Sequence, residues 1–331
     1  MTIACILLAF GPMIFYSMIV WWLDRWEREP ARLVCTVFAW GCLPAFAGAL
    51  ILQVLAHLFL AGSDASSSTA AMATITTVVA PVTEELLKAV PLLALMVIGR
   101  NEIDSWYDGV VYGAIAGFGF AAIENMFYFL QSATLDGGVA GLARSALARA
   151  VAFGPLHALC SAMTGAGCAA GCLATTRLGR VSWPIAGIVA AVACHSLHNV
   201  VVGSHGDAIT AWAVTTWTGV ASLLALAVLS VARQREVILS FLESEIAAGT
   251  LTRREAQAAF MPRRIALNTI LPVRGTCSIA RRYHALTTAA ADLAFARYRQ
   301  QRFGNRPGDD ARIAALRARV RTVCELLHAT T

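Results

Sequence analysis

The sequence predicts an all-α fold: a polytopic membrane helix bundle of about seven transmembrane helices, followed by a C-terminal helical tail. Of its 331 residues, 58% are hydrophobic and 14% are charged, whereas about 25% are charged in ordinary soluble domains. The mean hydropathy is +0.64, which argues against a soluble protein. Residues 1–232 contain 9 Lys and Arg and 12 Asp and Glu, whereas residues 233–331 contain 17 Lys and Arg and 8 Asp and Glu. We therefore predict a membrane domain over 1–232 and an arginine-rich helical tail over 233–331.

The membrane domain contains seven apolar stretches that could each cross a hydrocarbon core of about 30 Å. They are 2–23, 33–61, 71–98, 107–131, 142–173, 181–203 and 208–232. In the tail we expect short helices up to about Ala248, after Thr252, around 289–302 and over 309–327.

The distribution of arginines between the spans predicts the orientation of the chain. The first, third and fifth connections carry arginines, as does the whole tail, whereas the second and sixth carry no Lys or Arg. Cytoplasmic loops are enriched in these residues. We expect a multi-pass protein of the cell membrane with its N-terminus outside and its tail in the cytoplasm, where the arginines lie beside anionic lipid.

The third span carries ionisable residues that are costly in lipid. Glu84 and Glu85 are adjacent, and Lys88, the only lysine of the chain, follows one turn later. A charged side chain at a helix centre costs about 2.5 to 3.5 kcal/mol on insertion scales, so these residues should face protein or water. Pro81, just upstream, is expected to break the helix and open backbone groups toward a cavity.

The fourth span directs an acid toward a neighbouring helix. Gly113, Gly117 and Glu124 are spaced by four and seven residues, so they share one helix face. A Gly-xxx-Gly pair lets a second helix approach closely. We therefore expect Glu124 to face a packed partner.

Histidines occur at related positions of the next two spans. His157 lies on a small-residue face of the fifth span, and His195 and Asn199 are one turn apart in the sixth, with His198 between them. Measured from the cytoplasmic ends, Glu84, Glu124, His157 and His195 lie at depths of ~21 to ~26 Å at 1.5 Å per residue. The shared depth supports one common site.

The sequence lacks the motifs of three kinds of intramembrane protease. The chain has no HExxH, no GxSG-type elbow and no pair of transmembrane aspartates. The remaining inventory of carboxylates, imidazoles and an amide is typical of metal-free hydrolysis, with a glutamate as general base for water and His195 with Asn199 as oxyanion donors.

Several motifs in this order resemble the PrsW family of bacterial intramembrane proteases. They are EELLK at 84–88, DGVVYGAIAGFGFAAIEN at 108–125, HSLHN at 195–199 and DRWEREP at 24–30. The FxxxH of 153–157 and the HxxxN of 195–199 also resemble the wider glutamic-type group of CAAX prenyl and bacteriocin-processing proteases.

The resemblance implies a glutamate-dependent endopeptidase domain over 1–232 that cleaves membrane proteins, with single-span anti-sigma factors as the known substrate class. It also implies roles for individual residues. Glu84 and Glu85 match the catalytic pair, and His157 the histidine that helps to activate water. His195 with Asn199 matches the pair that stabilises the oxyanion, and Glu124 with Asn125 matches an EN motif that orients the site.

Two departures and one open point qualify this resemblance. Lys88 stands where the wider group has an arginine, which favours the PrsW branch, and His198 replaces an aromatic residue, which leaves open whether it joins the site. Zinc is compatible with a Glu/His cluster, but no ligand spacing indicates it, so we expect no cofactor.

Two other functions remain open at this point. Intramembrane Glu and His also build transporters and proton relays, although the inverted repeats typical of transporters are not found in the sequence. A non-catalytic membrane scaffold of the same fold would use the polar cluster only for packing. We expect the lipid bilayer and a membrane-protein substrate as partners, and no nucleic acid; the oligomeric state is left open.

Overall fold

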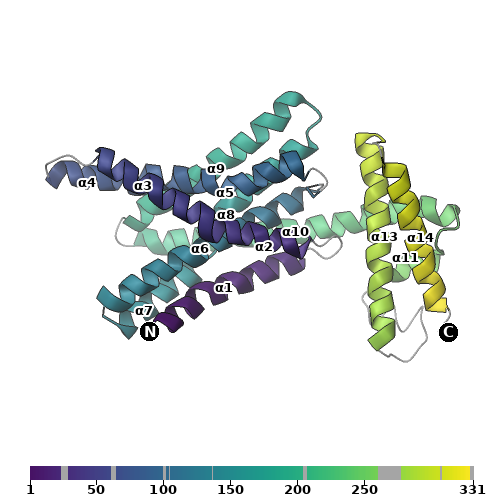
Figure 1. Ribbon diagram of the computed structural model, residues 1–331, viewed down its shortest axis with the longest axis horizontal. Helices are drawn as coiled ribbons and strands as arrows, with labels where there is room; N and C mark the ends of the chain where they lie inside the picture. Colours follow the sequence, from purple (N-terminus) through teal and green to yellow (C-terminus); the bar gives the residue numbers. More distant parts are fainter. Residues whose placement is uncertain are drawn as a thin grey trace. The chain divides into compact units, whose positions relative to one another are not determined.

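The computed structural model describes residues 1–23, 29–60, 65–99, 102–103, 105–135, 137–203, 207–259, 277–305 and 308–328, and every regular element within these ranges is helical. The chain divides into two compact units, one of residues 1–226 without 24–28, and one that contains 227–331. The helices of the first unit are α1 (Thr2–Leu23), α2 (Ala31–Trp40), η1 (Gly41–Ala45), α3 (Phe46–Leu60), α4 (Ala65–Thr74), η2 (Ile75–Val79), α5 (Ala80–Ile98), α6 (Trp106–Leu135), α7 (Val139–Ala146), η3 (Leu147–Ala152), α8 (Leu156–Leu173) and α9 (Arg177–Gly203) (Figure 1).

Five stretches of helix within the described residues are long and apolar enough to cross a membrane: Thr2–Leu23, Ala31–Leu60, Trp106–Leu135, Val139–Leu173 and Arg177–Gly203. Each coincides with a predicted span. The predicted spans 71–98 and 208–232 are not among the five. The first of these carries Glu84, Glu85 and Lys88 at its centre. The second lies in α10 (Asp207–Ala247), only part of whose side chains are described.

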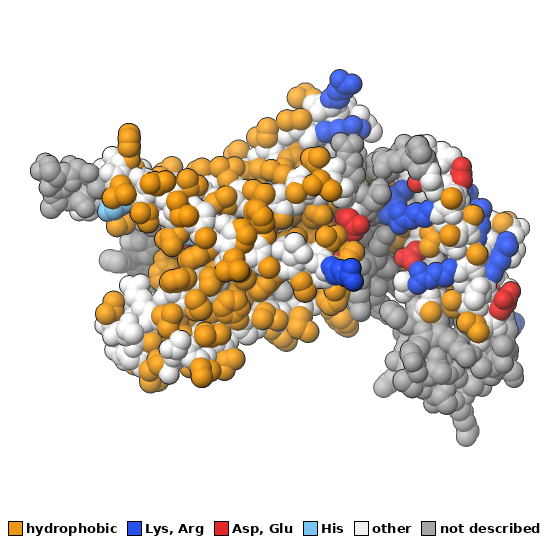
Figure 2. All heavy atoms as spheres, viewed as in Figure 1, with side chains coloured by type: hydrophobic (Ala, Val, Ile, Leu, Met, Phe, Trp, Pro, Cys, Tyr) orange, Lys and Arg blue, Asp and Glu red, His pale blue; other side chains and the backbone are white. Residues whose placement is uncertain are grey.

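The surface of the first unit is suited to contact with lipid. Figure 2 shows mostly hydrophobic side chains on the visible face of these helices, with charged side chains near the ends of the helices. Large apolar residues such as Phe15, Phe59 and Ile98 are strongly exposed. Buried polar side chains include Glu85, Lys88 and His195, so in this unit polar groups are gathered inside an apolar shell.

Helix α6 is the centre of the first unit, because every residue from Tyr107 to Ala122 is buried. A Cβ atom added to Gly113 would collide with the backbone oxygen of Ser161, and one added to Gly117 with that of His157. The predicted glycine face of α6 is therefore confirmed, and its partner is α8. The close approach brings the side chains of Glu124 and His157 together.

Three π-helical segments interrupt the helices around the site: η1 before α3, η2 before α5, and η3 before α8. A π turn holds an extra residue and is often found at functional sites. The break expected at Pro81 is not formed: Pro81 is the second residue of α5, just after η2, so the proline follows a local π distortion of one continuous helix. The chain passes from α4 through η2 into α5 with helical dihedral angles at both junctions.

The second unit is a small helical bundle with its own core. It contains the end of α10, α11 (Arg253–Ala259), α13 (Cys277–Phe303) and α14 (Asp309–His328). These bounds agree with the helices expected in the tail, except that α13 begins twelve residues earlier than predicted. Its core includes Leu242, Leu286, Leu293 and Val320, which are fully buried.

A buried ion pair connects the helices of the second unit. Glu245, at the end of α10, accepts hydrogen bonds from Arg317 Nε at 2.8 Å and Arg317 Nη2 at 2.7 Å, and a third from Thr250 Oγ1 at 2.9 Å. Burial alone would raise the pKa of Glu245, but the hydrogen bonds from Arg317 and Thr250 outweigh it and hold this pKa below its ordinary value.

Candidate active site

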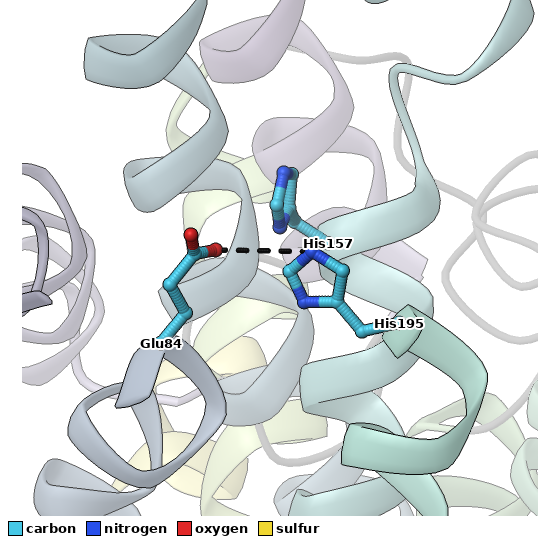
Figure 3. Close-up of side chains that lie close together, drawn as sticks. All are labelled: Glu84, His157 and His195. Atoms are coloured by element: carbon cyan, nitrogen blue, oxygen red, sulfur yellow. Dashed lines mark ion pairs between the residues drawn. The ribbon is translucent and has the colours of Figure 1, made fainter. Parts of the chain in front are cut away.

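Four helices each contribute polar side chains to one buried cluster in the first unit. Glu84, Glu85 and Lys88 come from α5, Glu124 from α6, His157 from the first turn of α8, and His195 from the middle of α9. Figure 3 shows Glu84, His157 and His195 converging from three of these helices. The acids and imidazoles that the sequence singled out therefore lie together.

Glu85 is the more fully paired of the two adjacent glutamates. Its Oε1 accepts a hydrogen bond from Lys88 Nζ at 2.7 Å and lies 2.9 Å from His195 Nδ1, and its Oε2 accepts one from Ser161 Oγ at 3.3 Å. The side chains of Glu85 and Lys88 are both fully buried. A carboxylate held by three partners is suited to orient its neighbours.

Glu84 has a different environment. Its Oε1 accepts a hydrogen bond from Gln53 Nε2 at 3.1 Å, whereas its buried Oε2 has no hydrogen-bond partner within the described part of the chain. That oxygen lies 3.8 Å from both His195 Nε2 and Lys88 Nζ. These separations are longer than direct hydrogen bonds, and polar atoms at such distances are often bridged by water.

The partners of His157 fix its protonation. Its Nδ1 lies 3.0 Å from Lys88 Nζ, and its Nε2 lies 2.9 Å from Glu124 Oε2. A lysine ammonium only donates hydrogen bonds and an ionised carboxylate only accepts them. His157 is therefore neutral, with its proton on Nε2 and its lone pair directed at Lys88.

Arg149 completes this side of the cluster. From the π-helical segment η3 it donates from Nη2 to Glu124 Oε2 at 2.6 Å and from Nε to Asn125 Oδ1 at 3.1 Å. Asn125 Nδ2 donates in turn to the backbone oxygen of Arg149 at 3.4 Å. The guanidinium also lies 3.6 Å from the centre of the Tyr128 ring, which favours a cation through the ring quadrupole.

Two residues from the predicted motif lie beside the cluster and contact other groups. Asn199 donates from Nδ2 to the backbone oxygen of Thr76 at 2.8 Å, which ties α9 to η2. His198 Nδ1 accepts a hydrogen bond from Trp212 Nε1 at 2.8 Å, and its ring contacts Phe153 edge-on. The oxyanion role of Asn199 stays a prediction, and the contacts of His198 are with aromatic residues.

The sequence did not single out four residues that contact the cluster. They are Gln53, Tyr128, Arg149 and Ser161. Arg149 and Ser161 share a four-residue spacing with His157, which was a usable signal. Gln53 was recognisable only as a polar residue inside an apolar span. Tyr128 resembles an ordinary aromatic residue on the apolar face of a helix.

The cluster also contains a donor set that fits a divalent cation. One ligand atom each from Glu84, His157 and His195 lie within 4.8 Å of one another, and a carboxylate with two imidazoles is a common catalytic zinc set. The unpartnered Glu84 Oε2 and the hydrogen bond that orients His195 agree with such a site. Lys88 competes with it, because its ammonium lies against the same side chains.

Comparison with known proteins gives a consistent result. A family model described as PrsW family intramembrane metalloprotease matches residues 29–233, more than half of the chain. The protein is 32% identical over 142 residues to Protease PrsW of Geobacillus kaustophilus (strain HTA426), which covers 43% of this chain and 55% of that protein. It is 30% identical over 107 residues to Protease PrsW of Bacillus subtilis (strain 168), a match that covers 32% of this chain and 45% of that protein.

The chain thus spans about half the length of the curated relatives it matches. No solved structure matches it. The family model, however, extends over every helix that contributes a carboxylate or an imidazole to the cluster. The chain belongs to the PrsW family.

Proposed function

We propose that this protein is an intramembrane protease that hydrolyses a peptide bond within or beside the membrane segment of another protein. Membership of the PrsW family supports this activity. The observation that carries the proposal is the buried Oε2 of Glu84, which has no hydrogen-bond partner among the residues that the structure describes and faces His195 Nε2 at 3.8 Å.

Glu84 is the proposed general base. Because His195 Nδ1 donates to the carboxylate of Glu85, the Nε2 of the neutral ring is an acceptor, as is Glu84 Oε2. A water molecule between these two atoms would donate one hydrogen to each, leaving its lone pairs directed at the substrate. Glu84 would take one proton as the water oxygen attacks the carbonyl carbon, and return it to the amide nitrogen as the C–N bond breaks.

The remaining residues position the site and balance its charge. Lys88 supplies positive charge close to the forming oxyanion and holds His157 Nδ1, while Arg149 holds Glu124, which accepts from Nε2 of the same ring. Asn199 donates one amide hydrogen to the backbone oxygen of Thr76, so its second amide hydrogen would be the donor to the oxyanion.

We propose that the reaction proceeds without a metal, because Lys88 already supplies a cation at these atoms. A zinc ion held by Glu84, His157 and His195 would instead supply a Lewis acid that polarises the carbonyl and lowers the pKa of water. A chelator distinguishes the two proposals.

The finer features of the membrane domain are also proposals. Five apolar helices support a multi-pass protein. We propose that 71–98 and 208–232 cross the bilayer as well, so that seven spans place the N-terminus outside and the arginine-rich residues 233–331 in the cytoplasm. A single-span anti-sigma factor is the proposed substrate class.

The test is cleavage of a single-span anti-sigma factor polypeptide in proteoliposomes, with the fragments identified by mass spectrometry. Glu84→Gln should lower the rate by ~10²- to 10⁴-fold, because removal of a general base typically costs that factor. Glu243→Gln is the matched control, since Glu243 is exposed on α10, and it should cleave at the wild-type rate.

Each alternative has a distinct result in the same vesicles. Cleavage that survives Glu84→Gln would refute the assignment of the base. Proton flux without cleavage would indicate a relay, and neither activity would indicate a scaffold. Loss of cleavage on addition of 1,10-phenanthroline, restored by zinc, would refute the metal-free reaction.

A further inference from the structure

A cleft between α3 and α6 leads to the candidate active site. It has a volume of about 200 Å³, and its apolar lining includes Ala49 and Leu50 of α3 and Phe127 of α6. Phe46 stacks on Phe127, with ring centres 5.2 Å apart and an interplanar angle of 21°. The walls are therefore built mainly from aromatic and aliphatic side chains.

The inner end of the cleft is polar and belongs to the catalytic cluster. Glu84 and Glu124 both line it, and Gln53 in its α3 wall donates to Glu84 Oε1 at 3.1 Å. A group lodged in the cleft would consequently lie directly beside the proposed base.

The outer rim is apolar and open. Leu50, Phe127 and Tyr128 are 47%, 50% and 43% exposed, respectively, and all three belong to helices that are apolar enough to span a membrane. A rim of this kind on a spanning helix faces lipid, so the cleft is accessible to a membrane-embedded segment.

We propose that this cleft is the subsite that receives one large apolar side chain of the substrate, such as Leu, Met or Phe, adjacent to the scissile bond. The inference rests on the proposed proteolytic function and adds its side-chain specificity. An acidic side chain is disfavoured because the inner carboxylates would repel it and the apolar walls offer it no partner. A small side chain would leave apolar walls unfilled and gain less from burial.

The volume agrees with a single residue. It is below the roughly 300 to 1,000 Å³ of sites that enclose whole small molecules, and it ends at Glu84. Discrimination by an apolar pocket is modest, about 10- to 200-fold for a methylene group. Because Leu and Phe exceed Ala by several carbon atoms, we expect either to be preferred over Ala by at least roughly tenfold at one fixed position from the cleaved bond.

The first test is residue preference. The probe is a library of synthetic single-span polypeptides with Ala, Ser, Leu, Phe, Trp or Asp at the central positions of the membrane segment, cleaved in proteoliposomes. Wild type should favour Leu and Phe, Phe127→Ala should shift the preference toward Trp, and Leu50→Trp should shift it toward Ala and Ser. The same preference in all three enzymes would overturn the proposal while leaving proteolysis intact.

The second test does not depend on cleavage. In the Glu84→Gln background, p-benzoylphenylalanine replaces Leu50 at the rim or, as the matched control, Phe59, which is 91% exposed on the same helix. Photocrosslinking to the Leu-containing polypeptide at position 50 well above that at position 59 supports the cleft as a binding site, even if wild type cleaves nothing and the proposed function fails. Equal crosslinking at both positions would overturn the subsite.

Discussion

The close contact between α6 and α8 makes the geometry of the site sensitive to one methyl group. The change to test is Gly117→Ala. A Cβ atom at this position would lie 2.5 Å from the backbone carbonyl carbon of His157 and 2.7 Å from the Cα of Ala158. Both neighbours are main-chain atoms of α8, so the clash cannot be relieved by rotating a side chain.

The size of the displacement follows from these distances. Ordinary van der Waals contact begins at 3.4 Å and the backbone oxygen of His157 is nearer still, so the two helices must separate locally by about 1 Å. The hydrogen bond of 2.9 Å from His157 to Glu124 and the contact of 3.0 Å from His157 to Lys88 cannot both survive such a shift. We expect overpacking to destabilise the first unit by about 1 to 3 kcal/mol and a misplacement near 1 Å to reduce turnover about 100-fold.

The assay compares three glycine substitutions in the full chain. Gly109→Ala meets a similar obstruction, with Gly165 C at 2.9 Å and Ala169 Cβ at 2.8 Å, but it lies eight residues from Gly117, about 12 Å along α6. Gly11→Ala on α1 meets no atom within 4 Å. Thermal unfolding in detergent and kcat for cleavage are measured for each variant.

We expect Gly109→Ala and Gly117→Ala to lose similar stability, with the larger loss of kcat in Gly117→Ala, and Gly11→Ala to match wild type in both measurements. Equal kcat for Gly117→Ala and Gly11→Ala would refute the link between helix separation and catalysis.

Three further changes test other parts of the structure. Arg149→Met removes the guanidinium that holds Glu124, and through Glu124 it loosens His157. We expect kcat to fall about 100-fold with little change in KM, the cost of a misplacement near 1 Å, and Arg149→Lys to recover part of it. His198→Phe should retain cleavage within about threefold, because only one hydrogen bond of about 1 kcal/mol, away from Glu84, is lost. Glu245→Gln should destabilise the second unit by about 1 to 3 kcal/mol, measured as faster hydrogen exchange in α13 and α14 of the full chain.

Each of these predictions can fail in a defined way. Unchanged kcat in Arg149→Met would show that Glu124 needs no support from the guanidinium, and a large loss of kcat in His198→Phe would place His198 in the chemistry.

Because the folded-state pKa of Glu245 is lowered, its stabilisation is fully present above about pH 4.5 and is lost as the pH falls through the folded-state pKa. Hydrogen exchange, corrected for intrinsic rate, should therefore accelerate toward pH 3 in wild type, and a variant with the same acid dependence would refute the role of this ion pair.

Apolar length and residue spacing were sufficient to predict much of the membrane domain. Five predicted spans coincide with apolar helices, and the four-residue spacing of Gly113 and Gly117 identified the face that packs on α8. These signals are periodic along one helix and need no knowledge of the partner. The third span was harder, because whether Pro81 breaks the helix depends on the turn before it, here the π turn η2, which residue spacing did not reveal.

The sequence was sufficient to predict which residues gather at the site but not the role of each residue. Glu84 and Glu85 are adjacent, and only the helices around α5 distinguish them, since Ser161 and His195 pair with one and Gln53 with the other. Such long-range pairings leave no trace in spacing along a single helix.

The π turn η2 has a consequence for how the carboxylates are aimed. A π turn takes up one extra residue, so the residues after it are rotated by about 100° from where a regular α-helix of the same sequence would place them. Were 75–79 a regular α-helical turn, the side chains of α5 would be turned by about that angle, away from His195, with the motif itself intact. The direction of these acids thus depends on a residue count upstream, and two chains with identical motifs could present them to different neighbours.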